Sequence, residues 1–311
     1  MESPTEATPN PLPLRKPEWL KVRLGGGANY ARIKGLREGL GLATVCEEAR
    51  CPNIGECWNA GTATFMLLGD TCTRACRFCN VKTGNPGGVV DGGEPERVAE
   101  AIATMGLSYV VFTMVDRDDL ADGGASHVAR CVEATRERSP NLLVEVLTGD
   151  FRAQRAPLAT VAASSASVLA HNVETVRSIT RRVRDGKSSY DNTLAALALY
   201  KELAPGKLTK SSLMLGLGES PAEVRETLRD LRAVNVDILT LGQYLQPTSW
   251  HLPVSEYVTP ERFEEWRTEA MQLGFLFVAA GPLVRSSYRA GELFTERWLR
   301  DHAAGSSGVS V

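Results

Sequence analysis

The sequence predicts an α/β fold in which helices cover a parallel sheet, and three observations favour this class. From about residue 62, short apolar runs alternate with longer amphipathic stretches that have helical spacing. The runs are apolar at nearly every position, as expected for strands that are buried on both faces. Six or seven such units follow one another, which predicts a partial (β/α)6 TIM-like barrel with N-terminal and C-terminal extensions. A doubly wound open sheet is the alternative, because periodicity alone does not separate the two.

Few regular elements are expected ahead of the barrel. Residues 1–17 contain five prolines and few large apolar side chains, so we expect a disordered or loosely docked arm. A helical pattern follows over 30–40, and Pro52, Gly55 and Gly61 then favour loop structure. The resulting division is an arm at 1–17, an N-terminal extension at 18–61, a barrel at 62–280 and a C-terminal extension at 281–311.

Within the barrel, strands and helices are expected to alternate. The expected strands cover 64–69, 108–114, 142–147, 167–170, 212–217, 236–241 and 275–279. The expected helices cover 95–105, 124–138, 153–163 and 190–203, with one more after Ser220 and one after Thr259. Ser220, Pro221 and Glu223 form a capping-box pattern that predicts where the first of these two helices begins. The sequence Thr259-Pro260-Glu261 follows the same logic for the second.

The composition limits the class of protein. The chain has a formal net charge of −2, so it has no overall positive charge that would attract nucleic acid. Its 43% hydrophobic and 23% charged residues are ordinary for a globular protein. No apolar run is long enough to span a bilayer, and the first residues lack the pattern of a secretory signal. We therefore expect a cytoplasmic protein with no nucleic-acid and no membrane partner. In a reducing compartment, clustered cysteines indicate metal or redox chemistry.

Six of the seven cysteines fall between residues 46 and 79, in two triplets. The first triplet is Cys46, Cys51 and Cys57, spaced C-x4-C-x5-C, and the second triplet is Cys72, Cys76 and Cys79, spaced C-x3-C-x2-C. The second triplet follows an expected strand, and the carboxyl ends of strands carry the chemistry of such barrels. Cys131 lies apart on an expected helix, where we expect it to be a buried core residue.

Each triplet is one cysteine short of a closed iron–sulfur site. Three thiolates can bind three irons of a [4Fe–4S] cluster, whereas a ferredoxin-type site needs a fourth cysteine. The iron that lacks a thiolate is then open to a small molecule or to another ligand. A structural zinc site is the alternative for the second triplet, but zinc sites favour C-x2-C pairs and four ligands. For the first triplet, V-R-S-S-Y at 284–288 could supply an oxygen ligand, although a Ser-Ser pair is usually only a polar loop.

The two triplets in this order, together with R-S-S-Y at 285–288, resemble the lipoyl synthase family of the radical S-adenosylmethionine superfamily. The resemblance covers about residues 40 to 290. It continues in V-D-R-D-D-L-A-D-G-G-A at 115–125, H-N-V-E-T-V at 171–176, L-M-L-G-L-G-E at 213–219, L-G-Q-Y-L-Q-P-T at 241–248 and G-P-L-V-R-S-S-Y at 281–288. The chain departs from the family pattern at Met114 and Gly149, so specific contacts at these two positions are not carried over.

The resemblance implies that two sulfur atoms are inserted at C6 and C8 of an octanoyl chain attached to a lysine of a lipoyl carrier domain. It implies two [4Fe–4S] clusters and S-adenosylmethionine as cofactors. The second triplet would bind the cluster that releases a 5′-deoxyadenosyl radical from S-adenosylmethionine. The first triplet, with Ser286 as the fourth ligand, would bind an auxiliary cluster that is consumed as the sulfur source. The two extensions would carry and cover this auxiliary cluster.

Five further residues are expected near S-adenosylmethionine, namely Phe78, Thr113, Glu145, Asn172 and Arg184. Glu145 is polar within an apolar strand, so it either meets a ribose or forms an ion pair inside the barrel. Arg184 either receives the carboxylate of the cofactor or belongs to a solvated basic run. His171 begins the same motif as Asn172 and is a weaker candidate, because a lone histidine is more often structural.

The resemblance also implies partners. The carrier domains are the glycine cleavage H-protein and the acyltransferase subunits of 2-oxoacid dehydrogenases. An electron donor such as flavodoxin or ferredoxin is implied, as is an iron–sulfur carrier that rebuilds the consumed cluster. Two other hypotheses stay open. One is another radical enzyme with an auxiliary cluster, of the methylthiotransferase or biotin synthase type, against which the upstream triplet and R-S-S-Y argue. The other is an iron–sulfur electron carrier or a structural zinc protein.

Overall fold

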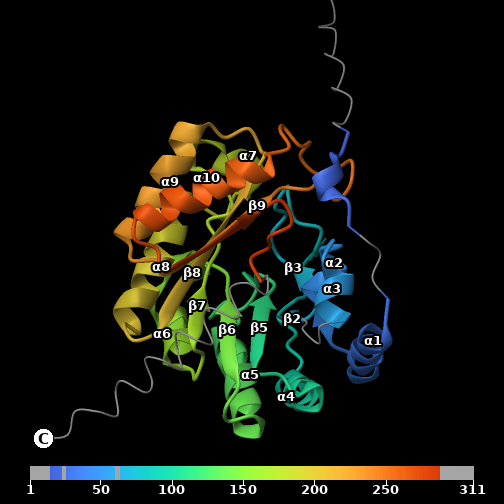
Figure 1. The fold of residues 1–311 in the computed structure, drawn as a ribbon. Helices are drawn as coiled ribbons and strands as arrows, with labels where there is room; N and C mark the ends of the chain where they lie inside the picture. Colours follow the sequence, from blue (N-terminus) through green and yellow to red (C-terminus); the bar gives the residue numbers. More distant parts are fainter. Residues whose placement is uncertain (1–14, 23–25, 60–63, 288–311) are drawn as a thin grey trace, which may run out of the picture.

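The computed structural model describes residues 15–22, 26–59 and 64–287, and in this part of the chain one eight-stranded sheet curls into an open barrel (Figure 1). The strand order is β1-β2-β5-β6-β7-β8-β9-β10, and every neighbouring pair is parallel except β1 with β2. The strands are β1 (Ala43–Thr44), β2 (Thr64–Leu67), β5 (Tyr109–Met114), β6 (Leu143–Leu147), β7 (Val168–Ala170), β8 (Leu208–Leu215), β9 (Ile238–Gln243) and β10 (Phe277–Gly281). The arm expected at 1–17 falls mostly outside the described residues.

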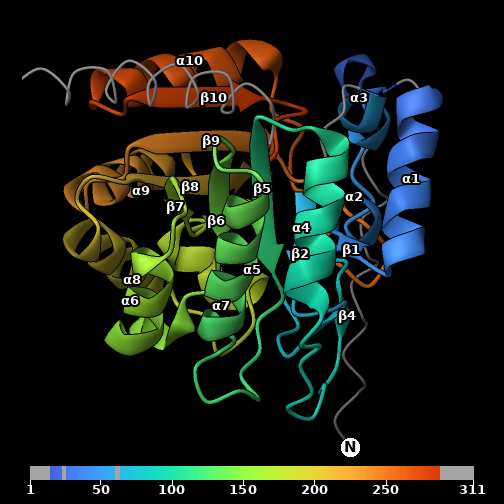
Figure 2. The ribbon, with the colours of Figure 1, turned by 90° about the horizontal axis from the view of Figure 1, so that it is seen from below.

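The helices that follow the strands lie on the outside of this sheet (Figure 2). They are α4 (Glu94–Met105), α5 (Ala125–Arg138), α6 (Arg155–Ala163), α8 (Tyr190–Leu203), α9 (Pro221–Ala233) and α10 (Pro260–Gln272). Each parallel strand lies beside the one that precedes it in this series, so the chain winds in one direction. A doubly wound sheet would reverse its strand order partway, so that alternative is wrong and the partial barrel is confirmed. Among the described residues, β1 and β10 are the two edge strands and do not pair with each other, so the barrel stays open between them.

The expected helix starts after Ser220 and Thr259 are confirmed. The Ser220 hydroxyl accepts from the Glu223 amide while the Glu223 carboxylate accepts from the Ser220 amide at 2.8 Å, which completes the capping box of α9. At the start of α10, the Thr259 hydroxyl accepts from the amide of Arg262 at 3.3 Å. Each bond pairs an amide that has no partner inside its own helix.

The core lies between the strands and these helices. The side chains of Val98, Ile102 and Met105 on α4 are all buried, as the spacing of apolar residues on this helix predicts. Cys131 on α5 is fully buried in the same cluster, so the expectation of a core cysteine is confirmed. These contacts hold the helices against the faces of the strands.

Strand β8 begins at Leu208, four residues before the expected strand at 212–217. The pattern of apolar residues missed the first part of this strand because that part is mostly polar, although it is buried. Lys210 on this part points into the barrel, where its ammonium group lies 2.8 Å from both oxygens of Glu145. The Tyr109 hydroxyl donates to the same carboxylate at 2.6 Å. A buried ion pair therefore occupies the barrel interior, which a hydrophobicity pattern cannot reveal.

The segment that holds the first triplet is more helical than expected. Cys46 lies on α2 (Val45–Glu48) and Cys57 lies on α3 (Ile54–Asn59), so the expectation of loop structure is wrong for both residues. Trp58 on α3 is fully buried and stacks on Tyr30 of α1 (Ala28–Leu40), with ring centroids 5.0 Å apart. Burial of this large aromatic side chain outweighs the low helix propensity of a single glycine. Figures 1 and 2 show α1, α2 and α3 together on the β2 side of the barrel.

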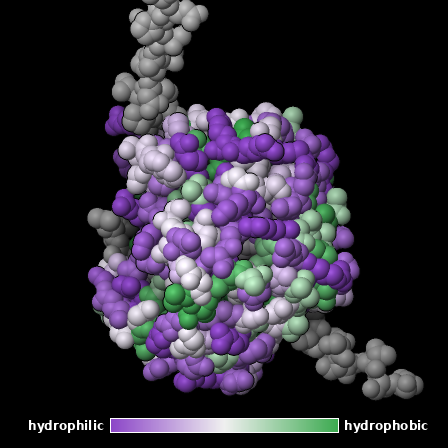
Figure 3. Space-filling model, turned by 180° about the vertical axis from the view of Figure 1, so that it is seen from behind, coloured by the Kyte–Doolittle hydropathy of each residue, from purple (hydrophilic) through white to green (hydrophobic). Residues whose placement is uncertain are grey.

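The surface of the described residues is predominantly polar. On the face opposite to that of Figure 1, hydrophilic residues cover most of the surface, and the hydrophobic patches are small (Figure 3). Within residues 15–22, 26–59 and 64–287, no helix is both long enough and apolar enough to cross a membrane. The helices thus present polar side chains outward and apolar side chains to the sheet.

Candidate metal and cofactor site

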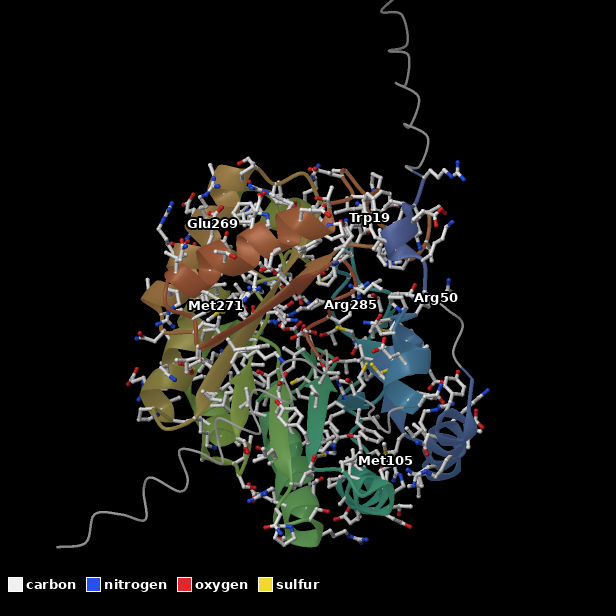
Figure 4. All side chains as sticks on the ribbon, viewed as in Figure 1. Trp19, Arg50, Met105, Glu269, Met271 and Arg285 are labelled. Carbon is white, nitrogen blue, oxygen red and sulfur yellow. The ribbon has the colours of Figure 1, made fainter. Side chains whose placement is uncertain are left out.

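The carboxyl ends of the parallel strands surround a cavity of about 520 Å³. Thr113 on β5, Leu147 on β6, Met214 on β8 and Gln243 on β9 line its barrel side. Figure 4 shows Arg285, from the C-terminal segment, between the barrel strands and the helices α2 and α3. The cavity therefore has walls from the barrel and from the segments at both ends of the chain. In barrels of this type, the chemistry is carried at this end of the sheet.

All three cysteines of the second triplet line this cavity. Cys72 ends the short strand β3 (Thr71–Cys72), and the other two cysteines follow on the connecting loop. The loop is held from outside by the end of α7 (Thr180–Val183) and by the residues that follow it. The Arg77 amide donates to the Val183 carbonyl at 2.8 Å, and the Ala75 amide donates to the Asp185 carboxylate at 2.9 Å. The Asp185 amide in turn donates to the sulfur of Cys76 at 3.3 Å. Backbone bonds thus fix the shape of the loop.

The thiols of the second triplet are shielded from water. Burial raises the pKa of Cys76 to about 11 and that of Cys79 to about 12, and it also raises the pKa of Cys72. A buried thiol binds metal by losing its proton, so the metal charge must replace the solvation that burial removes. Three half-buried sulfurs that face one cavity fit an iron–sulfur cluster, whose iron atoms are held by cysteine thiolates.

Arg74, within the second triplet, joins this loop to the ends of three barrel segments. Its guanidinium group donates to both oxygens of Asp118 at 3.1 and 3.2 Å and to Asp150 at 2.9 Å. It also donates to the Ser188 hydroxyl at 3.1 Å, and its side chain is only 3% exposed. The sequence shows the aspartates at strand ends but does not show that one arginine binds them all, so this network was not predicted.

Gly149 makes room for that network. A Cβ atom at this position would lie 2.1 Å from a carboxylate oxygen of Asp116, which also faces the Arg74 guanidinium at 3.5 Å. The departure from the family pattern at Gly149 therefore has a steric reason in this chain. Met114, the other departure, lines the cavity.

The first triplet reaches the same cavity from the other side. Cys46 and Cys51 line it, while Cys57 lies half-buried on α3 with its amide bonded to the carbonyl of Asn53 at 2.9 Å. Burial raises the pKa of Cys46 to about 11 and also raises the pKa of Cys51. These thiols are shielded like those of the second triplet, so their donor set suits the same class of metal group.

Ser286 lines the cavity as well, together with Ser287 and Arg285. The preceding residues are anchored on both sides. The Asn53 side chain donates to the Leu283 carbonyl at 2.7 Å, and a Cβ at Gly242 on β9 would come within 2.2 Å of the Val284 carbonyl oxygen. Only glycine permits this close approach, so the C-terminal segment lies against both the barrel and the loop of the first triplet. Tyr288, the last residue of R-S-S-Y, lies outside the described residues.

Arg184 is buried and lines the cavity, unlike the exposed Arg181 and Arg182. The alternative of a solvated basic run therefore holds for Arg181 and Arg182 but not for Arg184. One guanidinium nitrogen, Nη1, donates to the Thr193 hydroxyl at 2.7 Å. Its Nε is buried and has no hydrogen-bond partner among the described residues. An unpaired buried donor of this kind fits a site for an anionic group, since leaving it unpaired costs about 1–3 kcal/mol.

Three other expected residues also line the cavity: Phe78, Thr113 and Asn172. Phe78 packs against a small apolar cluster that includes Val183 and Tyr244. The Asn172 side chain donates to the carboxylate of Glu174 at 3.1 Å. Glu174, a further lining residue that was not predicted, has a positive φ of 64°, and burial raises its pKa. The signal in the sequence that could have identified Glu174 is its position in H-N-V-E-T-V, the motif that contains Asn172.

Glu145 is not brought to the cavity. Its carboxylate is occupied by Lys210 and Tyr109, two groups that also point into the barrel. Glu145 lies two residues before the lining residue Leu147 on β6. Its partner Val111 likewise lies two residues before the lining residue Thr113 on β5. Of the two alternatives for Glu145, the structure shows the ion pair inside the barrel. Its carboxylate does not face the cavity where a ribose would bind.

A separate trio of Glu94, His127 and Cys131 brings three potential metal ligands within 4.8 Å of one another. Their hydrogen bonds explain the arrangement without a metal. Glu94 accepts from the Leu68 amide at 2.8 Å and lies 2.6 Å from His127 Nε2, while Arg130 donates to His127 Nδ1 at 3.0 Å. Because a guanidinium group only donates, His127 Nδ1 is the acceptor, and His127 Nε2 carries a hydrogen and donates it in a hydrogen bond to the Glu94 carboxylate. The trio therefore has a structural role: through Glu94 it binds the Leu68 amide, which directly follows β2.

Comparison with known proteins agrees with this geometry. The radical SAM superfamily model matches residues 66–231, and the model for the N-terminal domain of lipoyl synthase of the radical SAM family matches residues 6–51. The chain is 57% identical to a lipoyl synthase of Thermus thermophilus over 95% of this chain and 91% of that protein. It is also 57% identical to a lipoyl synthase of Anaeromyxobacter dehalogenans over 90% and 95%.

Solved structures with much lower identity share the fold. Streptococcus suis SuiB bound to the precursor peptide SuiA has a TM-score of 0.54 at 11% identity, covering 74% of this chain and 52% of that chain. Coproporphyrinogen III oxidase HemN from Escherichia coli, described as a radical SAM enzyme, has a TM-score of 0.50 at 15% identity, covering 67% and 52%. At such identities the likeness concerns the fold alone, here the open parallel barrel.

Proposed function

The chain belongs to the lipoyl synthase family of the radical SAM superfamily, and on that premise we propose that it inserts two sulfur atoms at C6 and C8 of an octanoyl chain held on a lysine of a lipoyl carrier domain. The observation that carries this proposal is that the second triplet, two cysteines of the first triplet (Cys46 and Cys51) and Ser286 all line one cavity. A site that transfers sulfur to carbon needs a means of breaking C–H bonds next to a source of sulfur. Two separated sites would support only electron transfer between them.

The second triplet, Cys72, Cys76 and Cys79, is proposed to hold one [4Fe–4S] cluster. Its three thiols would leave one iron of such a cluster without a cysteine, and Arg184 and Phe78 line the same cavity. When bound, the cluster and S-adenosylmethionine would supply a carbon radical able to abstract hydrogen from an unactivated C–H bond. No side chain could do this by acid–base chemistry, because such bonds are far too weakly acidic.

Arg184 is proposed to bind the carboxylate of S-adenosylmethionine through its unpaired Nε. A guanidinium group presents parallel N–H donors that match the two oxygens of a carboxylate. Thr113 and Asn172 would contact the polar groups of the same ligand, and Phe78 would offer it an apolar surface. Glu174 holds the Asn172 side chain at 3.1 Å and so fixes its direction.

The first triplet, Cys46, Cys51 and Cys57, is proposed to hold the auxiliary [4Fe–4S] cluster that is consumed as the sulfur source, with Ser286 as its fourth ligand. The anchoring of the preceding residues to Asn53 and Gly242 supports this assignment, because it keeps Ser286 at the cavity. A serine oxygen is a harder and more labile ligand for iron than a thiolate. Ser286 would therefore hold an iron less firmly than a fourth thiolate would.

The octanoyl chain is proposed to lie between the two triplets. The cavity has about 520 Å³, within the range of about 300–1,000 Å³ that small-molecule sites occupy. Met66, Val115, Leu147 and Met214 give it apolar walls, which suit an alkyl chain and exclude water from a radical.

The proposed protein partners are the glycine cleavage H-protein and the acyltransferase subunits of 2-oxoacid dehydrogenases. A flavodoxin or ferredoxin would supply electrons, and an iron–sulfur carrier would rebuild the auxiliary cluster. The cytoplasmic location stays a prediction, since related proteins are named as mitochondrial and chloroplastic as well as bacterial. The electron-carrier and zinc hypotheses have no support from the relatives, which are named as synthases.

The direct test incubates reconstituted protein with an octanoyl-lysine peptide, S-adenosylmethionine and a low-potential reductant. We expect 5′-deoxyadenosine and a peptide that has gained two sulfur atoms. We also expect about eight iron and eight sulfide per chain, as two cubane clusters contain. Protein with this iron content that forms neither product would contradict the proposal, and zinc without sulfide would contradict the cluster assignment itself.

A further inference from the structure

A line of buried polar groups connects Arg184 to Thr148 through Thr193 and His171. Arg184, His171 and Thr148 line the cavity, whereas Thr193 does not. The Arg184 Nη1 donates to the Thr193 hydroxyl at 2.7 Å, and that hydroxyl lies 3.1 Å from His171 Nε2. The other ring nitrogen of His171 lies 2.8 Å from the carbonyl oxygen of Thr148. The three side chains come from different segments: Arg184 follows α7, Thr193 lies in the first turn of α8, and His171 follows β7.

The hydrogens along this line can be assigned from the chemistry of its ends. A carbonyl oxygen only accepts, so His171 Nδ1 carries a hydrogen and donates to Thr148. Burial and the nearby Arg184 charge lower the pKa of His171 to about 4, so the ring is neutral near pH 7 and Nε2 is an acceptor. The Thr193 hydroxyl therefore donates to Nε2 while its oxygen accepts from Arg184.

Thr193 has one other possible acceptor. The carbonyl oxygen of Ser189, one helical turn earlier, lies 3.2 Å from the hydroxyl. Donation to Ser189 would leave the lone pairs of His171 Nε2 facing the lone pairs of the Thr193 oxygen, with no hydrogen between them. Donation to His171 pairs both groups, so the line from Arg184 to Thr148 is the arrangement with fewer unpaired atoms.

This line fixes one edge of a guanidinium group whose Nε has no partner. Arg184, Thr193 and His171 are 6%, 0% and 4% exposed, so water does not compete for these bonds. With Nη1 held by Thr193, the guanidinium plane cannot turn without breaking a buried bond. A long side chain that is already ordered loses less conformational freedom when a ligand binds.

We propose that Thr193 and His171 are positioning residues that hold the Arg184 guanidinium in the orientation that receives the carboxylate of S-adenosylmethionine. The inference rests on the proposed function, in which Arg184 binds that carboxylate. Thr193 acts only through Arg184, and it is not among the residues that line the cavity. His171 lines the cavity itself, but its proposed role is exerted through Thr193, as the neutral acceptor that directs the hydroxyl hydrogen away from Arg184.

The test compares ligand binding rather than turnover. Thr193→Val removes the hydroxyl at nearly constant volume, and Thr209→Val is the matched control. Thr209 is also fully buried, and its hydroxyl donates to the Asn235 carbonyl at 3.1 Å, at the amino end of β8 and outside the cavity lining. The probes are S-adenosylmethionine and its decarboxylated analogue, with dissociation constants measured on full-length reconstituted protein. Thr193→Ser restores the hydroxyl.

We expect Thr193→Val to weaken S-adenosylmethionine binding about tenfold, the usual size of a lost hydrogen bond to a charged group. Binding of the decarboxylated analogue should change less than about twofold, because it has no carboxylate for Arg184. Thr209→Val should leave both constants unchanged, and Thr193→Ser should restore the affinity for S-adenosylmethionine. If the valine variant does not fold, Thr193→Ala gives the same comparison.

Equal weakening of both ligands by Thr193→Val would overturn the proposal, because it would show a general disturbance of the cavity. Unchanged binding of S-adenosylmethionine would also overturn it. Arg184→Met separates this inference from its premise. If that variant binds S-adenosylmethionine normally, the proposed role of Arg184 fails. If it binds tenfold or more weakly while Thr193→Val binds normally, only the positioning role fails.

Discussion

The side-chain amide of Asn53 donates a hydrogen bond to the carbonyl oxygen of Leu283 at 2.7 Å, although 230 residues separate the two in the sequence. Asn53 lies between Cys51 and Cys57, and Leu283 lies three residues before Ser286. This bond therefore joins the loop of the first triplet to the segment proposed to supply its fourth ligand. Asn53 is almost completely buried, and the bond is partly buried.

Replacing Asn53 should loosen this connection. Asn53→Ala removes a partly buried hydrogen bond worth about 1 kcal/mol, and it takes away the partner of the Leu283 carbonyl. We expect the auxiliary cluster to lose iron to a chelator faster than in the wild type, with little change at the second triplet. Iron and sulfide analysis during chelation measures this. The control is Asn59→Ala on the same segment, whose amide donates to Gly26 at an exposed position. Equal rates of loss in both variants would argue against the role of Asn53.

Ser286 and its neighbour Ser287 should behave differently. Both line the cavity, but only Ser286 is proposed as an iron ligand. Ser286→Ala should lower the retention of the auxiliary cluster at least about tenfold, the scale on which even indirect changes at metal sites act. Ser287→Ala should retain it. Electronic absorption and iron content of protein that lacks the second triplet report this cluster alone. The reverse result would move the ligand assignment to Ser287.

Arg74 should matter for the second triplet through the shape of its loop. Arg74→Lys keeps the charge but cannot bind Asp118 and Asp150 with a planar fork of donors. We expect a loss of roughly 3 kcal/mol in the free energy of unfolding, as when a buried ion pair loses a partner. We also expect a lower iron content in protein that lacks the first triplet.

The control for Arg74 is Arg117→Lys in the neighbouring loop. Arg117 is equally buried and binds both oxygens of Asp119 at 2.8 Å, but it does not line the cavity. Denaturant unfolding should show a comparable loss of stability, while the iron content should stay normal. If both lysine variants lose iron equally, the effect is one of general stability and not of loop shape.

Glu145 and Lys210 should act on stability and not on the cofactor. Lys210→Met leaves a buried carboxylate with only Tyr109 as a partner, which costs roughly 3–5 kcal/mol. The double variant Glu145→Leu with Lys210→Met should recover most of this loss, since it leaves no buried charge unpaired. Chemical denaturation measures both. The double variant should bind S-adenosylmethionine with wild-type affinity, and a tenfold weaker constant would restore Glu145 as a ligand residue.

The sequence predicted the barrel and both triplets because these leave local patterns. Apolar runs report strands, the Ser220 cap reports a helix start, and the cysteine spacing reports a metal site. Glu145 shows the limit of such patterns. A polar residue in an apolar strand can face the cavity or the barrel interior, and only the register with Lys210 on β8 separates the two. The helices around Cys46 and Cys57 were missed because Trp58 stabilises them through contacts with Tyr30.

The Arg74 network and the line from Arg184 to Thr148 were missed for a related reason. Both join residues that are distant in sequence and are set by where loops converge at the strand ends. Aspartates and histidines after strands are a signal for a polar site there, but they do not report which partner each group will meet. Pairing of this kind depends on how the whole sheet curves and brings the loops at its strand ends together.

The central claim is that the first triplet holds the sulfur that reaches the substrate in the cavity shared with the second triplet. The most direct measurement reconstitutes the clusters with heavy-isotope sulfide and follows the mass of the octanoyl peptide in a single turnover, with unlabelled sulfide in solution. The account predicts that the product carries heavy sulfur at both C6 and C8. A product with unlabelled sulfur, or heavy sulfur in a variant whose first triplet is replaced by alanine, would contradict it.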